Sequence, residues 1–352
     1  MTARRPSGAV VTGIGVVSPQ ARTPAEVPVV AARPRAAEGW FDARAEVGRG
    51  HKYLPPSGQF LLAAAGRALA GDPGWTGAAP AEGKGVVVGT NGGVSSLHDS
   101  IDRTVVEADA DELSPATAPF FSINLLSSYL SAQHGLKAFN VTLTTPRTAA
   151  LEAIELGTRA LAVGRCRSFL AGATEAPLAP IESDDSGEAG AAVLLLERAD
   201  AAVARDATVF GSCQVRTAFL PPRLAAGPGG RAAAEGTLED AVAGLGGGGG
   251  PVIAHVMADD SPVGAAVADA VRRLASAGPG PVPEPAPPTG AGCLEPLMQV
   301  ARLLATGDRP MLTVTAAVTG HVAVAHLSPG PPATPVVATR AVAAANLGRY
   351  PC

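Results

Sequence analysis

Residues 140–157 read NVTLTTPRTAALEAIELG, and this stretch is the best guide to the fold class. Its first residues are typical of a β-strand, the TTPRT segment predicts a tight turn, and the apolar spacing beyond it predicts a helix. Enzymes often hold a nucleophile at such a strand-to-helix elbow. The residue at this corner is Arg147, whose guanidinium stays protonated and has no free lone pair. The elbow therefore carries a cation that cannot attack a substrate.

Short apolar runs alternate with helix-spaced segments along the rest of the chain, which predicts an α/β protein with layered sheets and helices. The expected strands cover 8–12, 85–89, 168–172, 190–196, 252–255, 311–315 and 321–327. The expected helices cover 57–71, 122–134, 148–163, 262–276 and 294–306.

Composition excludes several classes of protein. The 352 residues are 47% apolar and carry a net charge of −4, so the chain is globular and has no basic field that would attract nucleic acid. The apolar run near the N-terminus is soon broken by Gly and Pro, and no run reaches the length of a transmembrane helix. We therefore expect a cytoplasmic protein with neither a nucleic-acid nor a membrane partner.

Neither a metal site nor a cofactor site is expected. The four cysteines lack C-x-x-C spacing, so they predict no zinc site and no disulfide framework. The glycine run at 244–250 precedes a strand instead of joining a strand to a helix, so it is interpreted as a loop and not as a phosphate cradle. The proline-rich stretch at 279–288 predicts an extended connector.

Three segments, taken together, resemble the β-ketoacyl synthase (ketosynthase) family. They are VVTGIGVVSP (10–19), FNVTLTTPRTAALEAIELGTRALAVGRCRSFLAGATEA (139–176) and GEAGAAVLLLERADAAVARDATVFG (187–211). The resemblance implies a thiolase-like fold, layered αβαβα, with two similar halves. It divides the chain into an N-terminal half at 1–204, a C-terminal half at 205–327 and a Pro/Ala-rich tail at 328–352.

Family members condense acyl units with a cysteine at the elbow, whose pKa the helix N-terminus lowers, and with two histidines. Matching TTPRTAAL to the family's Thr-Ala-Cys-Ser-Ser pattern places Arg147 on the cysteine, and a shift by one residue supplies Pro146 or Thr148 instead. His255 in PVIAHVMADDSP matches the first histidine, although its Gly-Thr neighbours are altered. Ala291 falls where the second histidine is expected. The three positions Arg147, His255 and Ala291 therefore predict a degenerate catalytic set with no catalytic residue.

These losses resemble the chain-length factors of type II polyketide synthases, inactive homologues that pair with a ketosynthase and usually carry Gln at the elbow. We expect a non-catalytic subunit that forms a heterodimer with a ketosynthase α subunit, shapes the acyl tunnel and meets acyl carrier protein. Two alternatives stay open. One is an acyltransferase or hydrolase that uses His255 with water or with Cys293, and the other is a scaffold homodimer that docks acyl carrier protein.

Three roles stay open for Arg147: an ion pair or helix cap inside the fold, a contact with a partner subunit, or the binding of an anionic ligand. If it contacts the partner, Arg147→Ala should weaken association with the ketosynthase. His255 without a thiol beside it is interpreted as a core histidine.

Overall fold

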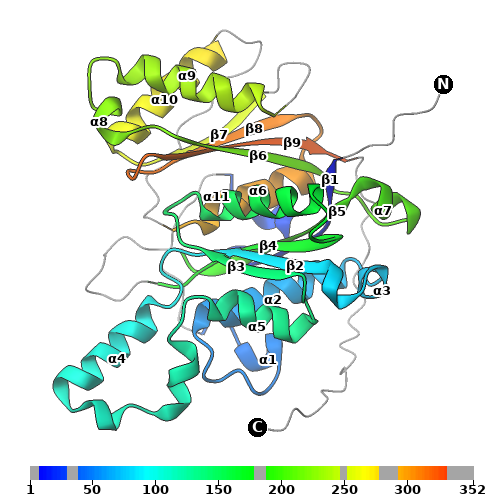
Figure 1. The fold of residues 1–352 in the computed structure, drawn as a ribbon, viewed down its shortest axis with the longest axis vertical. Helices are drawn as coiled ribbons and strands as arrows, with labels where there is room; N and C mark the ends of the chain where they lie inside the picture. Colours follow the sequence, from blue (N-terminus) through cyan, green and yellow to red (C-terminus); the bar gives the residue numbers. More distant parts are fainter. Residues whose placement is uncertain (1–7, 30–38, 178–187, 246–251, 277–291, 331–352) are drawn as a thin grey trace.

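The computed structural model describes residues 8–29, 39–177, 188–245, 252–276 and 292–330. Figure 1 shows five layers: helices, a sheet, a central helix pair, a second sheet and an outer helix layer. This is the expected αβαβα arrangement of the thiolase fold.

The first sheet has the strand order β3-β2-β4-β5-β1. Its three strands β3, β2 and β4 are parallel, whereas β5 and β1 run antiparallel to their neighbours. The strands are β1 (Ala9–Val17), β2 (Lys84–Gly89), β3 (Phe139–Leu143), β4 (Ser168–Glu175) and β5 (Gly190–Arg198).

The second sheet repeats this pattern over its described strands, in the order β7-β8-β9-β6. Here β7 and β8 are parallel, and β9 and β6 are antiparallel, as in the β2-β4-β5-β1 part of the first sheet. The strands are β6 (Gly211–Phe219), β7 (Val252–Ala258), β8 (Met311–Ala316) and β9 (His321–Pro329). The matching order and direction confirm the two similar halves, which join through the pair Val11 and Gly211.

Two helices fill the space between the sheets. α6 (Ala149–Ala162) packs on β2, β4 and β6, and α11 (Leu294–Thr306) packs on β5 and β9 (Figure 1). The helices on the side of the first sheet are α1 (Ala43–Val47), α2 (Pro56–Ala70), α3 (Trp75–Ala78), α4 (Ser95–Glu107) and α5 (Leu125–His134). The remaining helices are α7 (Ala199–Ala204), α8 (Pro222–Ala225), α9 (Gly230–Ala243) and α10 (Pro262–Ser276). Short 3-10 turns are η1 (Pro24–Glu26), η2 (Ala81–Gly83), η3 (Ala110–Glu112) and η4 (Pro115–Phe120).

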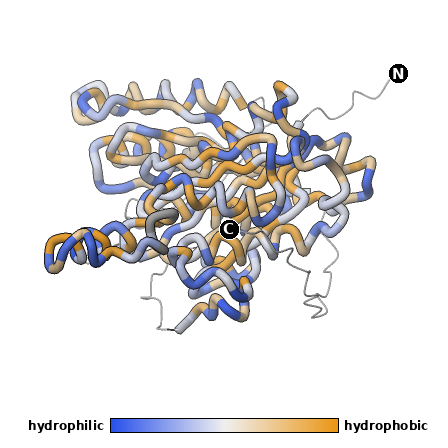
Figure 2. Tube along the Cα trace, turned by 60° about the horizontal axis from the view of Figure 1, so that its bottom comes forward, coloured by the Kyte–Doolittle hydropathy of each residue, from blue (hydrophilic) through white to orange (hydrophobic). Residues whose placement is uncertain are grey.

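The apolar core follows these layers. One cluster lies between the two sheets and takes in both central helices, and two others lie between each sheet and its outer helices. The hydropathy colouring of Figure 2 agrees with this, because it shows apolar stretches along the strands. α2 approaches β1 so closely that a Cβ at Gly15 would lie 1.9 Å from the carbonyl oxygen of Ala64. Glycine in the GIG segment therefore permits this layer contact.

All the strands and helices expected from sequence are present, with ends shifted by a few residues. The helix expected from 122 begins at Leu125, and the last strand continues to Pro329 rather than ending at 327. β6, α4 and α9 were not predicted, because their exposed polar positions hide the apolar pattern. Most of the glycine loop, the proline-rich connector and the tail from 331 lie outside the described residues.

None of the helices in the described part of the chain combines the length and the apolar character needed to span a bilayer.

Candidate functional site

The predicted elbow is present between β3 and α6. The backbone amide of Thr148 donates to the carbonyl of Pro146 across the corner, at 2.7 Å. Arg147 occupies the apex with a φ of 59°, in the left-handed region. That conformation costs a non-glycine residue roughly 1–2 kcal/mol, so the surrounding structure must hold it. The sequence prediction of a sharp strand-to-helix turn is confirmed.

The Arg147 side chain points into the protein. It is only 4% exposed, and its Nε lies 3.7 Å from Oδ2 of Asp259, which directly follows β7. β3 and β7 belong to different halves, so this ion pair joins the elbow of the first half to the second half. Of the three roles considered from sequence, an ion pair inside the fold is the one whose partner the structure identifies.

Asp259 is held in place by the loops around it. Its Oδ2 accepts a hydrogen bond from the backbone amide of Val318 at 2.9 Å, in the turn between β8 and β9. Its Oδ1 accepts from the backbone amide and the hydroxyl of Ser261, just before α10. Sequence reasoning missed Asp259. The available signal was an acidic residue at the carboxyl end of a parallel strand, where sites of α/β proteins gather.

A cation is an unusual occupant of the N-terminal end of a helix. The exposed N–H groups and the macrodipole make this end of α6 positive, which would lower the pKa of a thiol there and disfavours an arginine. Glu152 in the first turn of α6 supplies negative charge and accepts from the hydroxyls of Thr145 and Thr148 at 2.8 and 2.7 Å. Glu152 thus complements the positive end of α6, and Asp259 offsets the charge of Arg147.

His255 lies within β7 and is almost fully buried. Its Nε2 is 2.7 Å from Nη2 of Arg302 on α11. The guanidinium can only donate, so Nε2 accepts and the imidazole is neutral. Burial first, and then the Arg302 charge, lower the pKa of His255 to about 4. The lone pair that a general base would use is therefore already engaged.

The strand geometry separates His255 from the residue that meets the elbow. Asp259 comes four residues later, a distance of roughly 13 Å along an extended chain. The residue from this segment that pairs with Arg147 is thus Asp259, whereas His255 pairs with α11.

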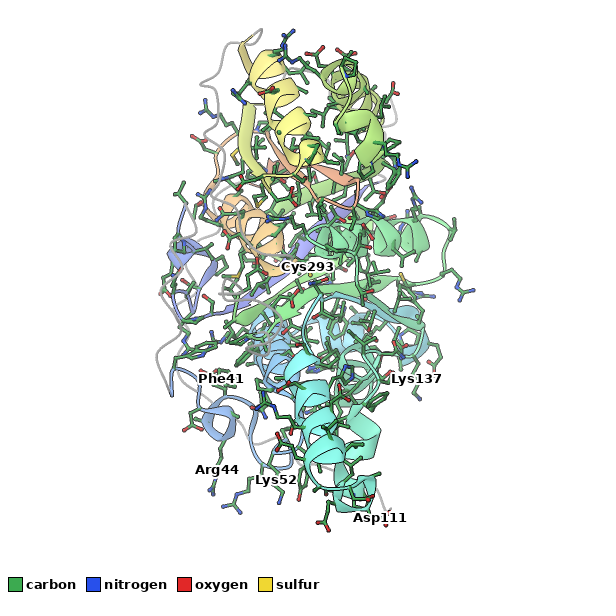
Figure 3. All side chains as sticks on the ribbon, turned by 90° about the vertical axis from the view of Figure 1, so that its left-hand side faces the viewer. Phe41, Arg44, Lys52, Asp111, Lys137 and Cys293 are labelled. Atoms are coloured by element: carbon green, nitrogen blue, oxygen red, sulfur yellow. The ribbon has the colours of Figure 1, made fainter. Side chains whose placement is uncertain are left out.

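Ala291, the third predicted position, lies outside the described residues, but the start of α11 beside it is described. Cys293 precedes α11 and is fully buried. Figure 3 shows that it lies between the two sheets. Burial, and then the charges of Glu175 and Glu188, raise its pKa well above the usual value. A thiol in this setting stays protonated, so Cys293 is a poor candidate for a relocated nucleophile.

Two carboxylates cap this end of α11. Glu175, at the end of β4, accepts from the backbone amides of Asn91, Gly92 and Cys293 at 2.7–3.0 Å. Glu188 accepts from the amide of Leu294 at 3.1 Å. Burial raises the pKa of Glu175, and the N–H donors oppose that rise. Their role is structural, and within the described ranges no group of three or more His, Cys, Asp or Glu is placed to hold a metal ion.

Comparison with known families gives one match. The family "Beta-ketoacyl synthase, N-terminal domain" matches residues 36–211, half of the chain. No curated protein matches the sequence.

Solved structures match over nearly the whole described fold. The ishigamide ketosynthase/chain length factor aligns with a TM-score of 0.71 and 24% identity, covering 92% of this chain and 99% of the other. A ketosynthase solved with its type II polyketide synthase acyl-carrier protein (AntDE:AntF) gives 0.71 and 17%, covering 92% and 99%. A β-ketoacyl synthase from Burkholderia phymatum STM815 gives 0.67 and 15%, covering 92% and 100%. At these identities the likeness establishes the fold that all of them share.

Proposed function

This chain belongs to the β-ketoacyl synthase family, and from that premise we propose that it is a non-catalytic subunit of the chain-length-factor type. It pairs with an active ketosynthase of a type II polyketide, or fatty-acid-like, synthase. In the pair it stabilises the partner and shapes the acyl tunnel, and the assembly receives acyl groups from acyl carrier protein.

The observation that carries the proposal is the presence of an arginine at the strand-to-helix elbow. In the match to the family's motif, Arg147 takes the position of the nucleophile, and its side chain is buried and paired with Asp259. A guanidinium cannot form a thioester. The geometry of the turn is kept while the atom that does the chemistry is replaced, which favours a role for the scaffold over a role in covalent acyl transfer.

The other thiols of the described chain support the same conclusion. Cys166, Cys213 and Cys293 are all buried. Burial raises the pKa of Cys166 to about 11 and that of Cys213 to about 12. Burial, and then the charges of Glu175 and Glu188, raise the pKa of Cys293 well above its usual value. A nucleophilic cysteine needs the opposite shift and an accessible sulfur.

Two surface features support pairing with another subunit. β3 hydrogen-bonds only to β2 within the described sheet and forms its edge, so its outer backbone groups are free to pair with another strand. α4 projects from the body in Figure 1 and has no buried residue, and Figure 3 shows Asp111 at the far end of this arm. Val106 on α4 is 84% exposed. An amphipathic helix that leaves large apolar residues such as Val106 exposed is typical of a surface that a partner covers.

The first experiment is co-expression with a ketosynthase encoded beside this chain, followed by purification through a tag on this chain alone. We expect a stable complex with equal amounts of both subunits, measured by size-exclusion chromatography with light scattering. A chain that forms only homodimers in the presence of every neighbouring ketosynthase would favour the scaffold alternative and contradict the pairing.

Matched surface variants locate the interface. Val106→Asp on α4 should weaken binding of the ketosynthase by about tenfold or more, because it places a charge in an apolar contact. Val203→Asp on α7 changes an equally apolar, 71% exposed valine elsewhere and should leave binding unchanged. Equal effects of the two variants would argue against an interface at α4.

Catalysis by this chain is tested separately. The isolated chain is incubated with acyl-thioester substrate, and intact-protein mass spectrometry reads any covalent acyl group. We expect no adduct and no hydrolysis above background. An adduct, or hydrolysis that disappears in His255→Gln, would favour the enzyme alternative.

A further inference from the structure

A second candidate site lies at the opposite end of α6 from the elbow. A pocket of about 170 Å³ opens between the last turns of α6, the first part of β6 and the residues at Gly244. Thr158, which lines it, is eleven residues beyond Arg147, roughly 16 Å along the helix axis. The pocket is therefore separate from the position of the family's nucleophile.

The lining is positively charged although the chain as a whole is acidic. Three arginines, Arg159, Arg198 and Arg216, line the pocket, and Glu155 is the one carboxylate among its lining residues. Arg198 is paired with Asp200 through two hydrogen bonds of 3.0 Å, so Arg159 and Arg216 together with Glu155 leave one positive charge in excess. The whole chain carries a net charge of −4. Such a local excess of guanidinium groups favours an anion, which arginine binds with directed hydrogen bonds.

Glu155 does not neutralise this excess. Its carboxylate accepts from the amide and hydroxyl of Thr217, at 3.1 and 2.6 Å, and from Nη2 of Arg159 at 2.6 Å. Arg216 lies 3.5 Å from the same carboxylate and also donates to the carbonyl of Gly244. The buried Glu155 carboxylate thus orients the side chains of Arg159 and Arg216 at the pocket. Each guanidinium has further N–H groups that can donate to a ligand.

One polar group in the wall lacks a partner. The hydroxyl of Thr158 is buried and makes no hydrogen bond within the described structure. A buried hydroxyl without a partner costs about 1–3 kcal/mol, so such a group calls for an explanation. Leu161 and Val215 add apolar surface to the lining, which we call the apolar floor. The pocket thus combines cations, an unused hydroxyl donor and an apolar floor.

We propose that this pocket binds a small oxyanion, a phosphate or a carboxylate on a short apolar body. The arginines pair with its oxygens, the Thr158 hydroxyl donates to it, and the apolar floor takes the body. A ligand bound there would lie between α6 and β6, and therefore between the two halves of the fold. This site is independent of the proposed pairing with a ketosynthase.

The test uses isothermal titration calorimetry on the full chain with two probes, inorganic phosphate and hexanoate. Binding of hexanoate but not phosphate identifies a carboxylate ligand, and the reverse identifies a phosphate ligand. Arg216→Gln should weaken binding of the active probe by about tenfold, since it removes a charged donor. Arg272→Gln is the matched control, because Arg272 is similarly exposed and paired with Asp269 on α10. It should leave binding unchanged.

Thr158→Val supplies the second variant. It removes only the unpaired hydroxyl at nearly the same volume, so stability should stay equal or rise, while affinity for the probe falls about fivefold. This combination separates a ligand-binding hydroxyl from a merely structural one. The proposal is overturned if neither probe binds, or if binding is the same in wild type, Arg216→Gln and Thr158→Val.

Discussion

The N-terminal ends of α6 and α11 occupy equivalent places in the two halves, yet they are built in opposite ways. At α11 the carboxylates of Glu175 and Glu188 accept from backbone amides, which is the favourable arrangement for a positive helix end. At α6 a buried cation stands on a left-handed backbone and needs Asp259 from the other half. The first end stabilises the fold, whereas the second keeps a backbone geometry that costs free energy.

The largest effect should come from the stabilising end. Glu175→Ala removes the acceptor of three backbone amides inside the protein, and we expect a loss of about 4 kcal/mol in the free energy of unfolding, measured by urea denaturation. Glu175→Gln keeps one acceptor oxygen and should lose clearly less. If both variants unfold at the wild-type urea concentration, the carboxylate does not hold α11 in the way described.

The ion pair between Arg147 and Asp259 should contribute less to the free energy of unfolding than Glu175 does. Its two charged atoms are 3.7 Å apart, farther than the hydrogen bonds of Glu175, and Asp259 is partly exposed. Asp259→Ala removes a carboxylate that pairs with the buried Arg147 cation and should cost about 2 kcal/mol. Adding Arg147→Gly should restore part of that loss, since glycine accepts the positive φ and the charge is gone. A double variant that is less stable than Asp259→Ala would break the contrast between the two helix ends.

A pH dependence adds to the comparison through His134, at the end of α5, and His255, within β7. Burial lowers the pKa of both His134 and His255 to about 4, whereas an unfolded histidine titrates near 6.5. Between these values the unfolded chain binds more protons, so stability is complete above about pH 6.5 and falls as the pH drops toward 4.

We expect about 1–2 kcal/mol of the free energy of unfolding to be lost per histidine at about pH 5. Urea denaturation at about pH 7 and about pH 5 measures the difference. His255→Gln keeps an acceptor for Arg302 and should reduce the slope. An unchanged slope in that variant would show that His255 is not the group that titrates.

The smallest effect should belong to the second cap of α11. Glu188 accepts from the amide of Leu294, and Glu188→Ala should cost about 1 kcal/mol. Differential scanning calorimetry can resolve a change of this size. A loss as large as that for Glu175→Ala would show that the two carboxylates act as one unit.

Local pattern was sufficient for most elements of the fold. Buried strands such as β2 and β5 are continuous apolar runs, and α6 and α11 have clear helical spacing, so both kinds were predicted. β6 was missed because it alternates buried residues with exposed ones such as Gln214 and Arg216. α4 was missed because it buries nothing within this chain.

The candidate site divides in the same way. The turn at Arg147, the absence of a thiol there and the family could all be found from residues adjacent in sequence. The partner of Arg147 could not, because 112 positions separate it from Asp259 and only the packing of the two halves brings them together. The interpretation of His255 as a core histidine agrees with its burial, but its bond to Arg302 required the structure.

The sequence by itself determined the five-layered αβαβα plan and the absence of a thiol at the elbow, because periodicity and side-chain type are local properties of the chain. Only the tertiary structure decided which charges offset Arg147, which amides hold Glu175 and where a cationic pocket opens beside Thr158. These depend on distances between distant segments, and burial strengthens each such interaction in a way that no local pattern records.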